Sequence, residues 1–237
     1  MSISRARLDR FIGEKCNISR RDVRLFVAQK RIIIDDEVAS DISVIIDKFS
    51  KIVIDNEVLQ DNKPCYVMLH KPTGVVSATK DKQHKTVIDL LTLPEKTQLH
   101  IVGRLDLNTS GLVLLTNDSR WSERITSPDK KVIKRYIVTL KNPLTEDYIS
   151  AFEEGMYFQF ENITTQPASL TILSDHIAQV ELTEGRYHQV KRMFGRFRNP
   201  VVALHRQSIG NIVLADDLLV GQSRYLTPEE VKQVDQK

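Results

Sequence analysis

The spacing of apolar and polar residues predicts short helices at the start of the chain and strands after them. Up to residue 31, apolar residues recur every three or four positions in two stretches, as on the buried faces of helices. Ser19 fits the N-cap of the second helix, with Asp22 in the capping-box position. Apolar runs at residues 32–34 and 51–54 then indicate strands. The start of the chain is therefore predicted to be a small α/β module.

A polar segment that ends in proline, residues 61–64, separates this module from a longer series of elements. Apolar runs and alternation predict strands at residues 66–69, 112–116, 130–140, 168–173 and 177–182. Helical spacing predicts helices at residues 87–91, 121–125, 145–154 and from about residue 188. We expect two domains, residues 1–60 and 61–237. The fold class is α+β, with a mixed, largely antiparallel sheet flanked by helices in the second domain.

The composition is that of a globular protein, with 41% hydrophobic and 27% charged residues. No apolar run approaches the about 18 residues of a membrane span, and no signal-peptide pattern follows Met1. We therefore expect a cytoplasmic protein without a membrane partner. Cys16 and Cys65 lack metal-binding spacing and the six histidines are scattered, so no metal site is expected.

Basic residues gather in the first predicted domain. Residues 1–31 contain nine Lys and Arg against three Asp and Glu, whereas residues 32–60 contain two against seven. An arginine-rich helix face suits the phosphates of RNA, although an ordinary solvated basic face explains the charge equally well. The candidate RNA contacts in this domain are Arg5, Arg7, Arg20, Arg21, Arg24 and Arg31.

Three strings in this domain resemble the S4 RNA-binding module. They are Arg-Leu-Asp at residues 7–9, Ser-Arg-Arg at 19–21 and Arg-Ile-Ile-Ile at 31–34. Lys30 and Asp36 stand where that module usually has glycine. The resemblance implies that residues 1–60 bind RNA.

The most informative stretch of the second domain is the polar loop before the predicted strand at residues 112–116. Gly103 and Gly111 permit backbone angles that other residues resist, so the loop can present Arg104 and Asp106 in a fixed geometry. A solvated turn with a surface ion pair would explain the two charges alone. The whole string, Gly-Arg-Leu-Asp-x-x-Thr-Ser-Gly-Leu-x-Leu-Leu-Thr, resembles the central motif of the pseudouridine synthases of the RsuA and RluA type. That resemblance implies that Asp106 is the catalytic nucleophile.

Other segments extend this resemblance. Lys-Pro-x-Gly at residues 71–74 resembles the first motif of the family, although by itself it is an ordinary turn signal. Tyr136 would be a core aromatic by periodicity, but the resemblance implies that it stacks on the target uracil and takes the proton from C5. Residues 185–193 and 199–210 resemble the RsuA branch, with Lys191 where the family has the arginine partner of the nucleophile. The further RNA contacts expected in this domain are Lys71, Arg104, Lys134, Arg186 and Arg192.

The resemblance implies site-specific isomerisation of uridine to pseudouridine in 16S ribosomal RNA or a small-subunit assembly intermediate. Within the family, the chain is most like the synthase that modifies uridine 516. The reaction needs an ionised carboxylate, which a nearby lysine would orient, and it needs no redox change or external group. No cofactor is therefore expected, and we expect a monomer. A large-subunit ribosomal RNA synthase and a non-catalytic assembly factor remain alternatives. A glycoside hydrolase is disfavoured because it would usually need two paired carboxylates.

Overall fold

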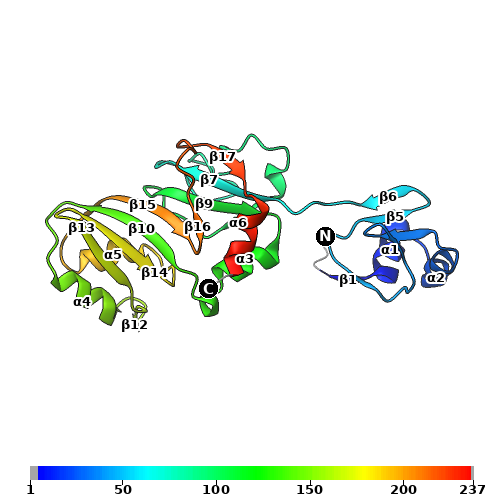
Figure 1. Cartoon of the computed structure of the whole chain (residues 1–237), viewed down its shortest axis with the longest axis horizontal. Helices are drawn as coiled ribbons and strands as arrows, with labels where there is room; N and C mark the ends of the chain where they lie inside the picture. The colour runs from blue at the N-terminus through cyan, green and yellow to red at the C-terminus, as the bar shows by residue number, and fades with distance from the viewer. Residues whose placement is uncertain (1–4, 236–237) are drawn as a thin grey trace. The chain divides into compact units, whose positions relative to one another are not determined.

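The computed structural model describes residues 5–235 of the chain, which divides into two compact units, Met1–Pro64 and Cys65–Lys237 (Figure 1). Residues 1–4 and 236–237, at the outer ends of the two predicted domains, lie outside the described residues. The division falls at the end of the polar segment 61–64. Each unit has a hydrophobic core of its own.

The first unit combines two helices, α1 (Leu8–Cys16) and α2 (Arg20–Ala28), with a small antiparallel sheet of order β3-β2-β5-β6. A separate antiparallel pair joins β1 to β4. The strands are β1 (Ala6–Arg7), β2 (Ile32–Ile34), β3 (Glu37–Val38), β4 (Ile45–Ile46), β5 (Ile52–Ile54) and β6 (Glu57–Gln60). The centre of the core consists of the fully buried residues Leu8, Ile12, Val23, Ile32 and Ile52.

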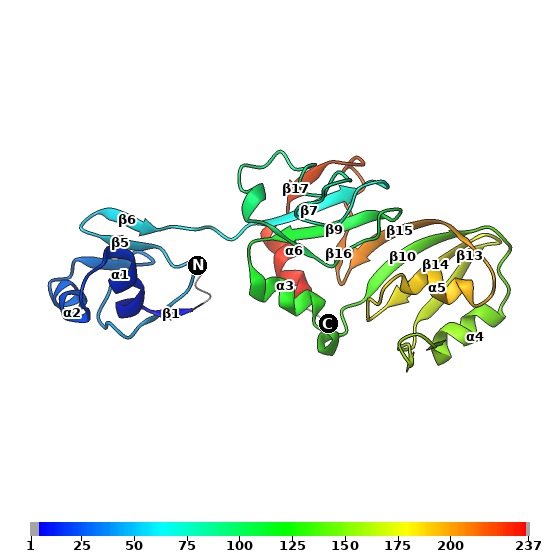
Figure 2. The same cartoon turned by 180° about the vertical axis from the view of Figure 1, so that it is seen from behind.

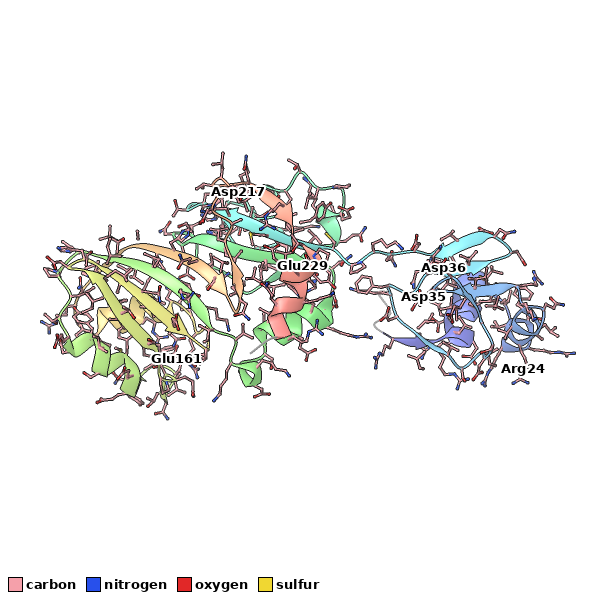
Figure 3. The ribbon with its side chains drawn as sticks, viewed as in Figure 1. Arg24, Asp35, Asp36, Glu161, Asp217 and Glu229 are labelled. Atoms are coloured by element: carbon pink, nitrogen blue, oxygen red, sulfur yellow. The ribbon has the colours of Figure 1, made fainter. Side chains whose placement is uncertain are left out.

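The start of α2 confirms the predicted capping box. The Ser19 hydroxyl accepts a hydrogen bond from the Asp22 amide at 3.2 Å, and the Asp22 carboxylate accepts one from the Ser19 amide at 3.1 Å. The exposed outer side of the helix carries Arg20, Arg21 and Arg24, of which Figure 3 shows Arg24 projecting from α2. The basic face of the first unit is therefore available at the surface.

The second unit is built on a nine-stranded sheet whose main path is β13-β14-β10-β15-β9-β7-β17, with β16 beside β15 and β8 beside β9. Among these strands only β15 and β9 pair in parallel. The expected mixed, largely antiparallel sheet is confirmed. Its strands are β7 (Tyr66–Lys71), β8 (His100–Val102), β9 (Ser110–Thr116), β10 (Lys134–Leu140), β13 (Ser169–Ser174), β14 (Ile177–Leu182), β15 (Val201–Ile209), β16 (Ile212–Val213) and β17 (Ser223–Tyr225).

Helices cover both faces of this sheet. Along β9, Val113 and Leu115 pack in the same cluster as α4 (Asp147–Glu154) and α5 (Gln189–Gly195), whereas Leu112 and Leu114 pack with α3 (Ser119–Thr126). A short helix, α6 (Pro228–Lys232), lies beside α3 (Figures 1 and 2). Since β9 is buried on both faces, its sequence is a continuous apolar run rather than an alternating one.

One local prediction for this unit was wrong, and one strand was missed. Residues 87–90 form turns rather than a helix: the amides of Asp89 and Leu91 donate to the carbonyls of Thr86 at 3.2 Å and Ile88 at 3.1 Å, three residues back, and these bonds do not continue into a helix. No strand was predicted for residues 201–209, yet β15 pairs with both β10 and β9 in the middle of the sheet. The strand that joins the two halves of the sheet was therefore not identified from its sequence.

Candidate active site

The loop that carries Arg104 and Asp106 connects β8 to β9, where β15 pairs in parallel with the start of β9. Gly111 has a φ of 111°, and a Cβ atom there would lie 2.2 Å from the carbonyl oxygen of Arg206. Any other residue at this position would collide with the β15 backbone. Glycine at position 111 therefore lets β15 approach the base of the loop.

Lys71 does not occupy the surface position expected of an RNA contact, so this prediction was wrong. Its side chain is fully buried, and its ammonium donates to the carbonyl oxygens of Pro72 at 3.0 Å, Asp106 at 3.0 Å and Thr109 at 2.7 Å. A buried ammonium requires hydrogen-bond acceptors, and the loop supplies them from its own backbone. Lys71 therefore holds the loop that carries Asp106 in place.

Arg206, on β15, holds the same loop from its other end, and the sequence had not singled it out. Its guanidinium is buried and donates to the carbonyl oxygens of Gly103 at 2.7 Å, Arg104 at 3.3 Å and Leu112 at 2.9 Å. No local pattern indicates this role, because an arginine in a polar segment is ordinarily an exposed residue.

Two further contacts fix the middle of the loop. The Ser77 hydroxyl donates to the Leu105 carbonyl at 2.8 Å and accepts from the Leu105 amide at 3.0 Å. The amide of Gly74 donates to the carbonyl of Leu107 at 2.9 Å. The segment after β7 and the loop after β8 therefore form one hydrogen-bonded structure on which the Asp106 side chain is mounted.

Asp106 lies beside two groups from the start of α5. The Nζ of Lys191 is 3.7 Å from Asp106 Oδ2, and Nε2 of His188 is 3.5 Å from Oδ1. His188 is the N-cap of α5 and has a φ of 50°, an uncommon conformation for a residue other than glycine. The expected pairing of Lys191 with Asp106 is present in the structure, whereas the approach of His188 was not predicted. The carboxylate remains 30% exposed, so a substrate can reach it.

The region around Asp106 contains several positively charged side chains. Burial lowers the pKa of Lys71 to about 8; the Asp106 carboxylate opposes this shift, and Arg206 and Lys191 add to it. The one carboxylate that acts on Lys71, that of Asp106, thus shares this region with the positive charges of Lys71, Arg206 and Lys191. The excess of positive charge favours an anionic ligand such as a nucleic acid backbone.

Tyr136 lies on β10 with only 8% of its surface exposed. It belongs to the same hydrophobic cluster as Leu105, which precedes Asp106, and Val190, which precedes Lys191. Its ring is therefore part of the same core as the residues that precede Asp106 and Lys191 in sequence. Its hydroxyl makes no hydrogen bond with the residues that the structure describes.

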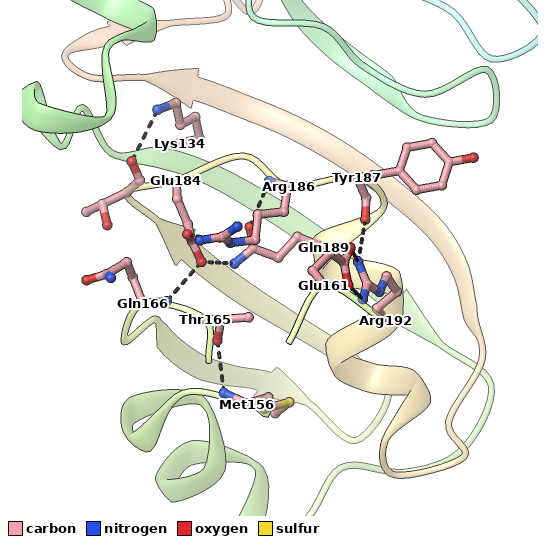
Figure 4. A network of polar contacts seen from close by, with 11 residues as sticks. Lys134, Met156, Glu161, Thr165, Gln166, Glu184, Arg186, Tyr187, Gln189 and Arg192 are labelled. Carbon is pink, nitrogen blue, oxygen red and sulfur yellow. Dashed lines mark hydrogen bonds and ion pairs between the residues drawn. The ribbon is translucent and has the colours of Figure 1, made fainter. Parts of the chain in front are cut away.

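The other residues expected to contact RNA in this unit differ in what their side chains already bind. Arg104 is exposed and makes no ion pair or side-chain hydrogen bond within residues 5–235. Lys134 is half-buried, burial lowers its pKa, and its ammonium donates to the Thr183 carbonyl at 3.4 Å. Arg186 pairs with Glu184 at 2.9 Å, and Arg192 binds both carboxylate oxygens of Glu161 at 2.5 Å (Figure 4). Arg104 is therefore the one whose guanidinium needs no rearrangement to reach RNA.

In the first unit, one buried carboxylate organises part of the basic face. Asp9 is 6% exposed and pairs with Arg7 at 2.9 Å and Arg20 at 2.7 Å, and these residues line a hollow at the surface. Arg31 pairs with Asp55 and lies over the Phe26 ring. Among the candidate RNA contacts of this unit, those without a hydrogen bond or ion pair to any described side chain are Arg5, Arg21 and Arg24.

Across residues 5–235, no group of three or more His, Cys, Asp and Glu side chains is arranged to hold a metal ion. In the same part of the chain, every helix is too short or too polar to cross a bilayer.

Comparison with protein families gives a match between residues 65–195 and the family described as RNA pseudouridylate synthase. The chain is also similar to two curated proteins named ribosomal small subunit pseudouridine synthase A. The one from Pseudomonas aeruginosa is 46% identical over 226 residues, which cover 95% of this chain and 98% of that protein. The one from Escherichia coli strain K12 is 40% identical over 229 residues, covering 96% of this chain and 99% of the relative.

A solved structure described as a pseudouridylate synthase has a similar fold. It is 41% identical in sequence, has a TM-score of 0.71, and the match covers 96% of this chain and 99% of that one. The matched family region includes the loop with Asp106, the strand with Tyr136 and the start of α5 with Lys191.

Proposed function

The chain belongs to the RNA pseudouridylate synthase family, and on that premise we propose that it isomerises a uridine of small-subunit ribosomal RNA to pseudouridine. The observation that carries this proposal is the Asp106 carboxylate, which is mounted on a hydrogen-bonded loop, paired with Lys191 and open to solvent. The two relatives named as small-subunit enzymes, similar over nearly their whole length, support the choice of RNA.

The reaction rearranges the bonds of one nucleotide without adding or removing atoms. The bond from uracil N1 to the sugar carbon breaks, the base turns, and C5 joins the same carbon, while a proton leaves C5 and N1 gains one. Asp106 acts as the nucleophile, at either uracil C6 or the sugar carbon, and both routes require an ionised carboxylate. Lys191 balances that charge and fixes its direction.

Tyr136 binds the uracil and takes its proton, and Arg104 replaces the extruded uridine in the RNA. Tyr136, on β10, offers a ring on which the uracil stacks, worth roughly 1–3 kcal/mol, and its oxygen takes the proton from C5 as its own hydroxyl proton passes to water. A stacked base is out of reach of the carboxylate, so the target must be extruded at a cost of a few kcal/mol. Arg104, exposed and unpaired within the described residues, fills the space that the uridine leaves.

Mapping the product nucleotide tests this function. The purified protein should form pseudouridine at a single position when it is incubated with 16S ribosomal RNA or a small-subunit assembly intermediate, and the resemblance designates uridine 516. The measurement is the position and yield of pseudouridine in 16S and in 23S ribosomal RNA. Pseudouridine in 23S RNA alone would identify a large-subunit synthase. Pseudouridine in neither RNA would favour the alternative of a non-catalytic RNA-binding assembly factor.

The first unit is proposed to bind the same RNA, as its resemblance to the S4 module implies. Its exposed arginines would contact phosphates, which makes binding sensitive to salt. The Arg7 and Arg20 guanidiniums, both held by Asp9, present a fixed pair of positive charges of the kind that binds phosphate oxygens.

Deleting residues 1–64 should weaken RNA binding and reduce its salt dependence, while the second unit stays folded on its own core. In the full chain, the double variant Arg21→Gln and Arg24→Gln should lower the slope of log K against log salt by about 0.7–0.9 for each phosphate that is no longer neutralised. The matched control is Lys232→Gln, an exposed residue on α6. An affinity and slope unchanged by the deletion would contradict an RNA-binding role for the first unit.

A further inference from the structure

Two aromatic side chains of the second unit are largely exposed. Phe160 is 96% exposed and Tyr187 75% exposed, and they are the two most exposed large hydrophobic side chains among residues 5–235. Phe160 lies in the turn between β11 (Tyr157–Phe158) and β12 (Ile163–Thr164), and Tyr187 precedes the N-cap of α5. Exposing so much apolar area is unfavourable in water, so both rings are candidates for a contact with a ligand.

One guanidinium ties the two rings to the same part of the molecule. Arg192 donates to both carboxylate oxygens of Glu161, the neighbour of Phe160, and its Nη1 also lies 3.4 Å from the carbonyl oxygen of Tyr187 (Figure 4). The guanidinium also lies 3.7 Å above the ring of Phe158. Arg192 follows Lys191, the partner of Asp106, so the hairpin that carries Phe160 is anchored beside the active site.

Tyr187 is joined to the site through a stack of rings. Its ring lies 3.8 Å from that of His188 with an angle of 20° between the planes, and Nε2 of His188 is 3.5 Å from Asp106. The imidazole covers one face of the tyrosine, and Figure 4 shows the Tyr187 ring directed away from the polar network around Glu184. A flat surface therefore extends outward from the carboxylate, and its outer part is free to stack with another ring.

The charge around these rings indicates what they bind. Residues 185–200 contain five Lys and Arg and no Asp or Glu. Arg186 and Arg192 are paired with Glu184 and Glu161. Arg196 and Arg198 are exposed and make no ion pair within residues 5–235. Free aromatic rings among cations are the typical surface for unpaired RNA, because the bases stack and the phosphates bind the positive charges. Extruding a uridine also unstacks its neighbours in the strand, which then need a new surface.

We infer that Tyr187 and Phe160 stack with unpaired nucleotides that flank the target uridine and so position the RNA strand over Asp106. This inference rests on the proposed function, because it takes the ribosomal RNA as the strand that is bound. It assigns the β11–β12 hairpin and the turn before α5 to substrate binding rather than to chemistry.

Steady-state kinetics of Tyr187→Ala and Phe160→Ala test the inference on the ribosomal RNA in which the wild-type protein forms pseudouridine. Each variant should raise KM by about 5- to 150-fold, which corresponds to the stacking of one base, with kcat within about twofold of wild type. Tyr187→Phe keeps the ring and should keep the wild-type KM. The control is Leu219→Ala, which removes a side chain that is 64% exposed in the loop before β17.

A second readout separates stacking from a structural role. An RNA fragment with 2-aminopurine next to the target uridine should lose fluorescence on binding the wild-type protein and lose less with Tyr187→Ala. An unchanged KM and unchanged quenching in both alanine variants, or a lower kcat together with a lower Tm, would overturn the inference. If the wild-type protein is active and the variants keep its KM, only this inference is refuted. If the wild-type protein is inactive on every ribosomal RNA, the proposed function is refuted.

Discussion

Replacing Asp106 by asparagine should reduce pseudouridine formation by about 10⁴-fold or more, the scale of losing a catalytic side chain that acts on the reacting atoms. The amide keeps the shape of the carboxylate but cannot form the covalent bond that the reaction needs. The loop should be unaffected, because Lys71 binds the backbone carbonyl of residue 106 and not its side chain. The measurement is tritium release from C5-labelled uridine in ribosomal RNA, together with the affinity for that RNA.

Asp216→Asn is the matched control, since Asp216 is an exposed aspartate in the segment before β17. It should release tritium at the wild-type rate. RNA affinity should be within a few-fold of wild type for both variants. If Asp106→Asn released tritium at a rate near that of the control, Asp106 would not be the nucleophile.

Lys71→Met should destabilise the second unit and lower its activity, although Lys71 touches no substrate in this proposal. Methionine fills much of the space of the lysine stem but donates no hydrogen bond, which leaves the carbonyls of Pro72, Asp106 and Thr109 without their donor. Leaving buried acceptors unpaired costs about 1–3 kcal/mol each, but removing a buried ammonium recovers part of its desolvation cost. That cost is evident from the pKa of Lys71, which burial lowers to about 8. The net loss should therefore be about 2–4 kcal/mol in the free energy of unfolding.

Urea unfolding followed by tryptophan fluorescence measures this loss, because the single tryptophan, Trp121, is fully buried in the second unit. Activity should fall about 10²-fold even where the variant is folded, since a displacement of the loop by about 1 Å is enough to misplace Asp106. Lys141→Met, at an exposed position, should change neither quantity. A folded Lys71→Met variant with wild-type stability and lower RNA affinity would instead restore the RNA-contact role that burial argues against.

The sequence predicted those elements whose signals are local. The capping box at Ser19 and Asp22 matched the start of α2, and the alternation of Tyr136, Val138 and Leu140 matched β10, although the strand predicted from residue 130 begins at Lys134. The apolar run of β9 correctly indicated a buried strand, because a strand covered on both faces has no polar positions. The turns at residues 87–90 were predicted as a helix because their apolar residues resemble part of one, whereas the backbone hydrogen bonds there join residues three apart and do not continue into a helix.

The sequence likewise predicted some site residues correctly and missed or misplaced others. Fixed motif spacing was enough to select Asp106 and Lys191, which the structure brings within ion-pair distance. The same motifs misplaced Lys71, since a lysine in a turn motif is ordinarily solvated and only the surrounding carbonyls make its burial possible. His188 and Arg206 carried no local signal of their own.

By itself, the sequence determined the type and order of most elements, the division into a basic first unit and a larger second one, and the carboxylate that we propose as the centre of the active site. Tertiary structure alone decided which charged side chains turn inward to hold the loop and which remain at the surface. Apolar periodicity and capping are properties of neighbouring residues. The burial of an ammonium or a guanidinium instead depends on carbonyl oxygens that strands far apart in the sequence bring together.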